Sequence, residues 1–194
     1  MSTAVILAGG KSRRMGSDKP RLVYNGKTFL QSAVDRFSQA FDRVLVSVAD
    51  RDKYADMGFE FVEDIYPGCG PMAGLHAALS ACRGDGVFLV AADMPFADPA
   101  AALRMIQLCG EYDICALRDK NGRVEPLFAY YKRALIPLAE ELLKSGQYKM
   151  YALFERARAR LLAPPELGAL WREGMLDNIN FPEDYDRLLS LKRK

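Results

Sequence analysis

The sequence predicts an α/β fold built on a doubly wound, mainly parallel sheet. Apolar runs of strand length alternate with segments of helical spacing from the first residues onward. The opening run, Ala4 to Ala8, is continuously apolar, as is typical of a strand covered on both faces. The chain has 194 residues, half of them apolar, and no repeat or linker divides it. We therefore expect one domain over residues 1–194.

The first half of the chain alternates regularly between the two kinds of element. Residues 28–40 have helical spacing, because their apolar side chains fall on one face. Asp98 stands directly before the helix expected at residues 99–109 and is a good candidate for its N-cap. The strands expected here are residues 4–8, 44–48, 59–62 and 87–92, and the helices are residues 28–40, 50–57, 73–82 and 99–109.

The second half of the chain is less regular. Its last helix is entered through Pro182, which suits the first turn. The strands expected here are residues 112–117, 127–131 and 160–163, and the helices are residues 132–145, 150–158 and 182–192.

Composition excludes several classes of protein. The net charge of +2 gives no concentrated basic excess, so we expect no nucleic-acid partner. The four cysteines form no C-x-x-C pair and His76 is the single histidine, so we expect reduced, mostly buried thiols and a structural His76. No basic segment precedes the run at residues 4–8, and no stretch approaches the roughly 20 apolar residues of a membrane span. We expect a cytoplasmic protein without a membrane segment.

The residues that follow three of the strands point to one ligand site. In open α/β sheets, ligands bind beyond the carboxyl ends of the strands, where the strand order reverses. The first strand is followed by Gly9 and Gly10, the third by Asp64 and the fourth by Asp93. If the order of these strands begins 3-2-1-4, the glycine loop and Asp93 stand side by side.

The loop after the first strand has the composition of a phosphate site. Its glycines allow close approach of the backbone to an anion, and Lys11, Arg13, Arg14 and Lys19 would neutralise a polyphosphate. The spacing excludes two familiar loops, since the first glycine of a P-loop would fall at Val5 and the G-x-G-x-x-G pattern is missed. A different type of phosphate loop is expected.

Asp93 is the candidate metal ligand. A carboxylate beside a phosphate needs a cation between them, and Mg²⁺ takes one or two carboxylates plus phosphate oxygens. The alternative is that Asp93 caps the next helix, but Pro95 and the distance to residue 99 favour Asp98 for that role.

Four motifs together resemble the molybdenum cofactor guanylyltransferases, a family of nucleotidyltransferases, and they run in order from about residue 4 to residue 188. They are Leu7-Ala8-Gly9-Gly10-x-Ser12-x-Arg14-Met15-Gly16-x-Asp18-Lys19, Gly70-Pro71-Met72-Ala73-Gly74-Leu75, Arg123-Val124-Glu125-Pro126-Leu127 and Asn178-Ile179-Asn180-x-Pro182-Glu183.

The resemblance implies a Rossmann-like nucleotidyltransferase fold, with Mg²⁺ as cofactor and GTP and molybdenum-bearing molybdopterin as substrates. GMP would pass to the phosphate of the molybdopterin. The residues implied to bind the nucleotide are Leu7, Ala8, Gly9, Gly10, Lys19, Ser47, Asp64, Gly74 and Asp93, with Asp64 at the guanine and Asp93 holding Mg²⁺. Those implied to act in catalysis are Arg14, Lys19 and Asp93, the first two holding the leaving pyrophosphate. Those implied to bind the acceptor are Asn178 and Asn180.

The chain departs from the family at Ser47, where the second strand of a relative can carry a nucleotide-contacting Asn. Arg123 and Glu125 have a supporting role, or form a surface ion pair. Asn180 contacts the acceptor, or caps the final helix. Transient contact with cofactor-delivery proteins and molybdoenzymes is expected.

Other functions stay open at this point. The acceptor could receive CMP, another phosphorylated acceptor could be used, or the chain could be a nucleotide-binding regulator without turnover. The presence of both Lys19 and Asp93 argues against the regulator, because sensing a base needs no metal ligand.

Overall fold

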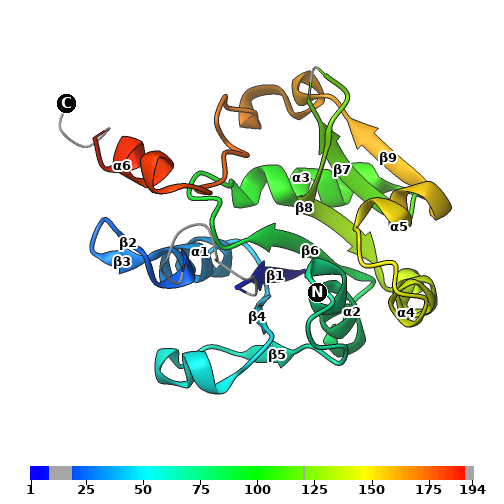
Figure 1. The fold of residues 1–194 in the computed structure, drawn as a ribbon. Coiled ribbons are helices and arrows are strands. Elements are labelled where there is room, and N and C mark those ends of the chain that lie inside the picture. Colours follow the sequence, from blue (N-terminus) through cyan, green and yellow to red (C-terminus); the bar gives the residue numbers. More distant parts are fainter. Residues whose placement is uncertain (9–18, 120, 191–194) are drawn as a thin grey trace.

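The computed structural model describes residues 1–8, 19–119 and 121–190 of the chain. A seven-stranded sheet runs through the molecule in the order β5-β4-β1-β6-β8-β7-β9, with helices on both faces (Figure 1). The loop over residues 9–18, to which Gly9, Gly10 and Arg14 belong, lies outside the described residues.

The parallel half of the sheet is centred on β1 (Thr3–Leu7), whose residues are all buried. It pairs with β4 (Arg43–Val48) on one side and β6 (Gly86–Ala91) on the other, and β5 (Phe61–Glu63) adds to β4. All three pairings are parallel. This confirms the expected order of the first four strands and brings their carboxyl ends to one edge.

The other half of the sheet contains one reversed strand. β8 (Val124–Lys132) lies between β6 and β7 (Ile114–Arg118) and is antiparallel to both. β9 (Ala159–Leu162) returns to a parallel pairing with β7. The sheet is thus mainly parallel, as expected, with β8 as the exception.

Alternate residues of the strands enter two separate cores. Ala4 and Ile6 pack on the face covered by α1 (Phe29–Ser38) and α3 (Pro99–Cys109). Val5 and Leu7 pack on the opposite face under three helices: α2 (Pro71–Ala81), α4 (Ile136–Lys144) and α5 (Tyr151–Arg156). This burial of both faces explains why β1 reads as a continuous apolar run.

A third, small cluster holds the chain's last helix. Phe29, Ile179 and Leu188 are buried together, and Leu188 belongs to α6 (Pro182–Ser190). Tyr185 Oη donates to the carbonyl of Val23 at 2.5 Å, so α6 lies beside the hairpin β2 (Val23–Tyr24) and β3 (Lys27–Thr28) (Figure 1).

Short elements account for most differences from the sequence-based expectations. The β2–β3 hairpin was not expected, although Asn25 and Gly26 have φ values of 57° and 78°, as a two-residue hairpin turn requires. The helix expected at residues 50–57 is the 3₁₀ segment η2 (Asp52–Met57). Three further 3₁₀ segments are η1 (Lys19–Arg21), η3 (Arg133–Leu135) and η4 (Pro164–Leu170). No helix in the described part of the chain is long and apolar enough to cross a membrane.

Candidate functional site

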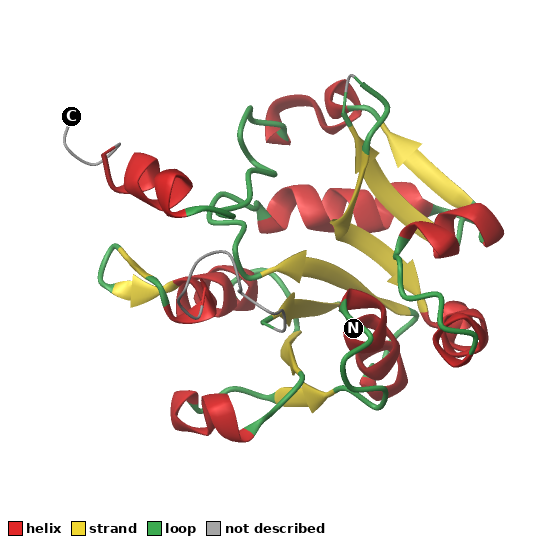
Figure 2. Ribbon diagram, viewed as in Figure 1, coloured by secondary structure: helices red, strands yellow, loops and turns green. Residues whose placement is uncertain are grey.

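The site lies at the carboxyl edge of the parallel strands, where the order reverses around β1 (Figure 2). Backbone hydrogen bonds continue past the strand ends, from Ala8 N to the carbonyl of Ser47 and from Ala92 N to the carbonyl of Leu7, both at 3.0 Å. These hydrogen bonds hold the backbone of Ala8 and Ala92 in place at the carboxyl edge of the sheet.

The first cavity has a volume of about 480 Å³ and contains five of the residues expected to bind a nucleotide, namely Leu7, Ala8, Ser47, Asp64 and Gly74. The rest of its lining comes from the segment after β4, from η2 and from the loop that leads into α2, namely Ala49, Asp50, Lys53, Tyr54, Gly68, Gly70 and the first helical residue, Pro71. Residues up to 67 positions apart in the sequence thus meet in one cavity, as the sequence predicted.

Gly74 allows α2 to approach the strands closely. A Cβ at this position would lie 2.4 Å from Ser47 Oγ and 2.7 Å from Leu7 Cδ2. A side chain would therefore push α2 away from the ends of β1 and β4. A glycine is therefore needed at this position for the close approach of α2 to the strands.

Asp64 carries an unusual carboxylate. Burial raises the pKa of Asp64 to about 6, although a hydrogen bond from Ser47 acts in the opposite direction. Its Oδ1 is buried and has no hydrogen-bond partner among the described residues. Buried polar atoms are normally paired, so an unpaired carboxylate oxygen beside a cavity marks a place for a ligand's N–H groups.

An aromatic wall was not expected from the sequence. Tyr54 in η2 is buried, and its Oη donates to the carbonyl of Ala8 at 3.4 Å. The Lys53 Nζ and the Arg21 guanidinium lie 5.2 Å and 5.5 Å from the centre of its ring. The sequence did contain a signal for these residues: Lys53 and Tyr54 follow shortly after the second expected strand, at the edge of the sheet where ligands bind.

Asp93 and Lys19 meet beside the first cavity. Lys19 Nζ lies 3.3 Å from Asp93 Oδ2 and donates to Asn180 Oδ1 at 2.9 Å. The backbone N–H of Ile179 donates to the carbonyl of Asp93 at 3.0 Å. Three of the sequence-predicted site residues, far apart in the chain, are therefore in direct contact.

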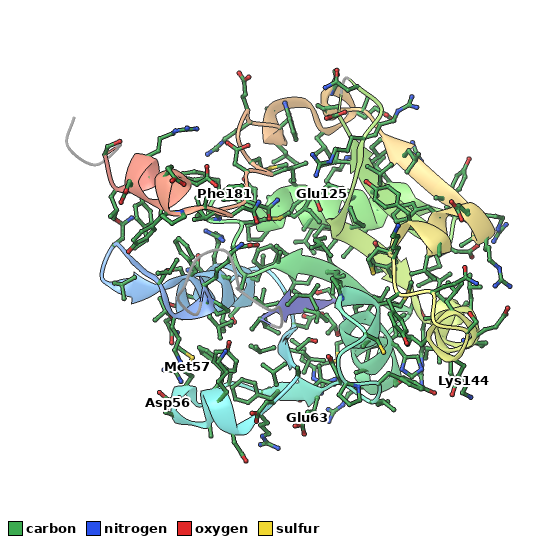
Figure 3. All side chains as sticks on the ribbon, in the orientation of Figure 1. Asp56, Met57, Glu63, Glu125, Lys144 and Phe181 are labelled. Carbon is green, nitrogen blue, oxygen red and sulfur yellow. The ribbon has the colours of Figure 1, made fainter. Side chains whose placement is uncertain are left out.

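The second cavity has a volume of about 400 Å³ and is lined by both asparagines, Asn178 and Asn180. Its other walls are formed by the β7–β8 turn and the segment before α6, namely Leu117, Asp119, Arg123, Val124, Glu125, Trp171, Gly174, Leu176 and Asp177. Glu125 and Phe181 lie in the upper half of Figure 3, whereas Asp56, Met57 and Glu63, from the elements beside the first cavity, lie in the lower half. The first cavity is lined from the ends of β1 and β4 and the second from β7 and β8, and β6 lies between these two pairs in the sheet.

The structure decides between the alternatives for Asn180. Its side chain accepts from Lys19, whereas the backbone N–H groups of Asn180 and Phe181 both donate to Asp184 Oδ2 at 3.0 Å. Asp184, and not Asn180, therefore stabilises the start of α6, and the helix-cap alternative is wrong. The neighbouring Asn178 donates from Nδ2 to the carbonyl of Leu176 at 3.3 Å.

Glu125 and Arg123 do not form an ion pair within the described parts of the chain. Glu125 Oε1 instead accepts from Leu127 N at 2.9 Å. Burial raises the pKa of Glu125, and the nearby Asp93 carboxylate acts in the same direction. Glu125 thus lines the second cavity with its carboxylate near enough to Asp93 for the two charges to interact.

The residues present suit Mg²⁺. Asp93 offers a hard carboxylate oxygen, and the ammonium group at its Oδ2 shows that a cation is accommodated there. Within residues 1–8, 19–119 and 121–190, no group of three or more His, Cys, Asp and Glu side chains could hold a metal. A site with one protein carboxylate fits Mg²⁺, which keeps water and substrate phosphates as its other ligands.

Asp98 and His76 have the structural roles expected of them. Asp98 Oδ1 accepts from Ala100 N at 2.7 Å and caps α3. His76 is buried in α2 against the ring of Tyr66, with 5.3 Å between ring centres, and burial lowers its pKa. The four cysteines are free, and three of them are buried.

Comparison with known proteins gives a consistent result. Residues 4–161 match the family described as MobA-like NTP transferase domain. A relative from Carboxydothermus hydrogenoformans, named "Probable molybdenum cofactor guanylyltransferase", is 30% identical over 190 residues, which is 97% of this chain and 95% of the relative.

Solved structures agree in fold. Molybdopterin-guanine dinucleotide biosynthesis protein A from Archaeoglobus fulgidus matches with a TM-score of 0.87 and 25% identity, over 98% of each chain. Rv0371C from Mycobacterium tuberculosis, solved as a complex with manganese, matches with a TM-score of 0.70 and 24% identity, over 97% of each chain.

Proposed function

The chain belongs to the family of MobA-like NTP transferases, and from this membership we propose that it is an enzyme that transfers GMP from GTP to the phosphate of molybdenum-bearing molybdopterin. The products are a guanine dinucleotide cofactor and pyrophosphate. The observation that carries the proposal is the position of the Asp93 turn: Ala92 N bonds to the carbonyl of Leu7, which lines the first cavity, and the carbonyl of Asp93 accepts from Ile179 N, between the two asparagines that line the second. We propose that a donor nucleotide in the first cavity faces an acceptor in the second across this turn.

Asp64 is the proposed reader of guanine. The Watson–Crick edge of guanine presents two neighbouring donors, N1–H and the 2-amino group. A carboxylate accepts both, and Asp64 lines the first cavity and has an oxygen, the buried Oδ1, without a hydrogen-bond partner among the described residues. Ser47, which stands where a relative can have Asn, contributes through its hydrogen bond to Asp64.

The reaction requires no catalytic base in this chain, because a phosphate is already a nucleophile at neutral pH. An oxygen of the acceptor phosphate forms a bond to the α-phosphorus of GTP, and the bond from that phosphorus to the bridging oxygen of pyrophosphate breaks. Lys19 would leave its contacts with Asp93 and Asn180 to hold the leaving phosphates together with Arg14. Gly9 and Gly10 would supply backbone donors to the same phosphates.

A divalent cation fits this chemistry, and Rv0371C, which shares the fold, was solved with manganese. For this chain we propose Mg²⁺ held by Asp93, where it would neutralise charge on the phosphate oxygens. Asn178 and Asn180 are the proposed contacts to the pterin, with Arg123 and Glu125 as supporting walls of the same cavity.

The proposal also includes the cellular compartment and the protein partners of the enzyme. The free cysteines suit a reducing cytoplasm. Transient contact with cofactor-delivery proteins and molybdoenzymes follows from the nature of the acceptor and product, since molybdopterin must reach the second cavity and the dinucleotide must leave it.

One incubation tests the proposed function. The protein is mixed with Mg²⁺, molybdenum-bearing molybdopterin and equal amounts of GTP and CTP, and the pterin product is identified by mass spectrometry. A GMP adduct with release of pyrophosphate is expected. A CMP adduct would reassign the base, and binding of GTP without any pyrophosphate release would indicate a regulator.

A further inference from the structure

The turn that follows β6 is held from outside at three consecutive carbonyl groups. The carbonyl of Asp93 accepts from Ile179 N at 3.0 Å. The carbonyl of Met94 accepts from Arg36 Nη2 at 3.2 Å, and that of Pro95 accepts from Arg36 Nη1. These bonds leave the backbone around Asp93 with little freedom to rotate.

Arg36 reaches this turn from α1, whereas Ile179 belongs to the segment before α6. Burial lowers the pKa of Arg36, and the neighbouring Asp98 carboxylate acts in the opposite direction. Its Nε is buried and has no partner among the described residues, and the hydrogen bonds of its guanidinium go to the two carbonyls. Among the described residues, no carboxylate forms an ion pair with this partly buried cation, and its hydrogen bonds to two backbone carbonyls indicate a role in holding the turn.

We propose that Arg36 is a positioning residue for the metal site, fixing the turn so that the Asp93 carboxylate points at the substrate phosphates. This inference rests on the proposed function, in which Asp93 holds the divalent cation. Arg36 touches neither substrate nor metal, and it acts only through the carbonyls of residues 94 and 95. The effect is one of preorganisation, since a carboxylate already aimed at the cation pays no ordering cost on binding.

The chemistry of arginine suits this role better than that of lysine. The guanidinium is a rigid planar fork, so two of its nitrogens reach two carbonyls without further ordering of the side chain. Lysine carries the same charge on a flexible stem and presents a single nitrogen. Arg36→Lys should therefore retain the fold and part of the effect, whereas Arg36→Gln should lose most of it.

The test measures metal binding directly. Mn²⁺ is titrated into the GTP-loaded protein and free Mn²⁺ is followed by electron paramagnetic resonance, while GTP binding without metal is measured by calorimetry. For Arg36→Gln we expect Mn²⁺ affinity to fall about 10-fold and metal-free GTP affinity to change less than about 2-fold, with an intermediate loss for Arg36→Lys. Arg104→Gln, which removes an exposed arginine of α3 bonded to Gln107, should match the wild type.

The outcomes separate the two proposals. If either folded Arg36 variant binds Mn²⁺ with wild-type affinity, the positioning role is wrong. If Arg36→Gln does not fold, the Mn²⁺ affinity of Arg36→Lys is the test. An equal loss of metal-free GTP affinity would also overturn the positioning role, since it would indicate general damage. Wild-type Mn²⁺ affinity in Asp93→Asn would instead remove Asp93 from the metal site, and the proposed function would fail at that residue.

Discussion

At the residue scale, the Asp64 carboxylate, which we propose binds guanine, destabilises the folded protein when it is ionised. Its pKa is raised from 3.8 to about 6, chiefly by burial. A raised folded-state pKa means that protonation favours the folded protein, so the associated stability is present at low pH and is lost as the pH rises through 6. Above that pH the folded protein contains a partly buried negative charge at Asp64, which lowers its stability.

Asp64→Asn should therefore stabilise the protein in a pH-dependent way. At pH 8 the variant should exceed the wild type by about 1 kcal/mol in free energy of unfolding, a discounted value for a partly exposed group, and at pH 5, between the unfolded and folded pKa values, by about half of that. Urea unfolding at both pH values measures the difference. A constant difference at pH 5 and pH 8 would show that titration of Asp64 is not the cause.

The same substitution should reduce recognition of guanine. The wild type should bind GTP more tightly than ITP, which lacks the 2-amino group, because one charge-assisted hydrogen bond contributes about 1.5–3 kcal/mol. Asp64→Asn should lose most of that preference, while the ITP affinity changes less. Calorimetric titration of both nucleotides tests this, and equal affinity of the wild type for GTP and ITP would remove Asp64 from the guanine edge.

At the element scale, the fit of α2 against the strands depends on Gly74. Gly74→Ala raises helix propensity by about 1 kcal/mol but places a methyl group 2.4 Å from Ser47 Oγ and 2.7 Å from Leu7 Cδ2. We expect a net loss of about 1–3 kcal/mol in stability, because overpacking outweighs propensity, together with weaker GTP binding.

Ser80→Ala is the matched control, since Ser80 is exposed on the same helix. It should change stability by less than about 0.5 kcal/mol. Urea unfolding compares the two variants. A stabilised Gly74→Ala protein would mean that α2 shifts without cost, and the close-approach argument would fail.

Local signals explain which elements could be predicted. α3 was expected at residues 99–109 and occupies Pro99–Cys109, because Asp98 and Pro99 mark its start clearly. β2 and β3 are two residues each, too short for any alternation to appear, so the Asn25-Gly26 turn was their sole signal. β8 begins at Val124, three residues before the expected start, because Pro126 suggested a loop while pairing with β7 draws the segment into the sheet.

At the scale of the whole molecule, the site depends on contacts that no local pattern contains. The first cavity was predictable, because every parallel strand delivers its next residues to the same edge. The contact of Lys19 with Asn180 spans 161 positions and depends on how the segment before α6 returns to the turn after β6. The resemblance named both residues, whereas their direct contact required the structure. A single domain over residues 1–194 stays a prediction.

Asn178 and Asn180, both in the segment before α6, have different contacts, so their roles can be tested separately. Asn178 lines the second cavity and, within the described residues, its side chain bonds locally to the carbonyl of Leu176, whereas Asn180 also holds Lys19, which contacts Asp93. Asn178→Asp should spare GTP affinity and weaken molybdopterin binding about 10-fold, because Asp adds repulsion toward the acceptor phosphate and removes the amide donors.

Asn180→Ala should disturb both substrates, since Lys19 loses the partner that fixes its position beside Asp93. GTP and molybdopterin are titrated separately against each variant, with circular dichroism to confirm that both are folded. Because Asp184, and not Asn180, bonds the N–H groups at the start of α6, neither substitution should unfold that helix. If Asn178→Asp keeps wild-type affinity for molybdopterin, the second cavity is not the acceptor site. If both variants lose GTP affinity equally, the division of roles between the two asparagines is wrong.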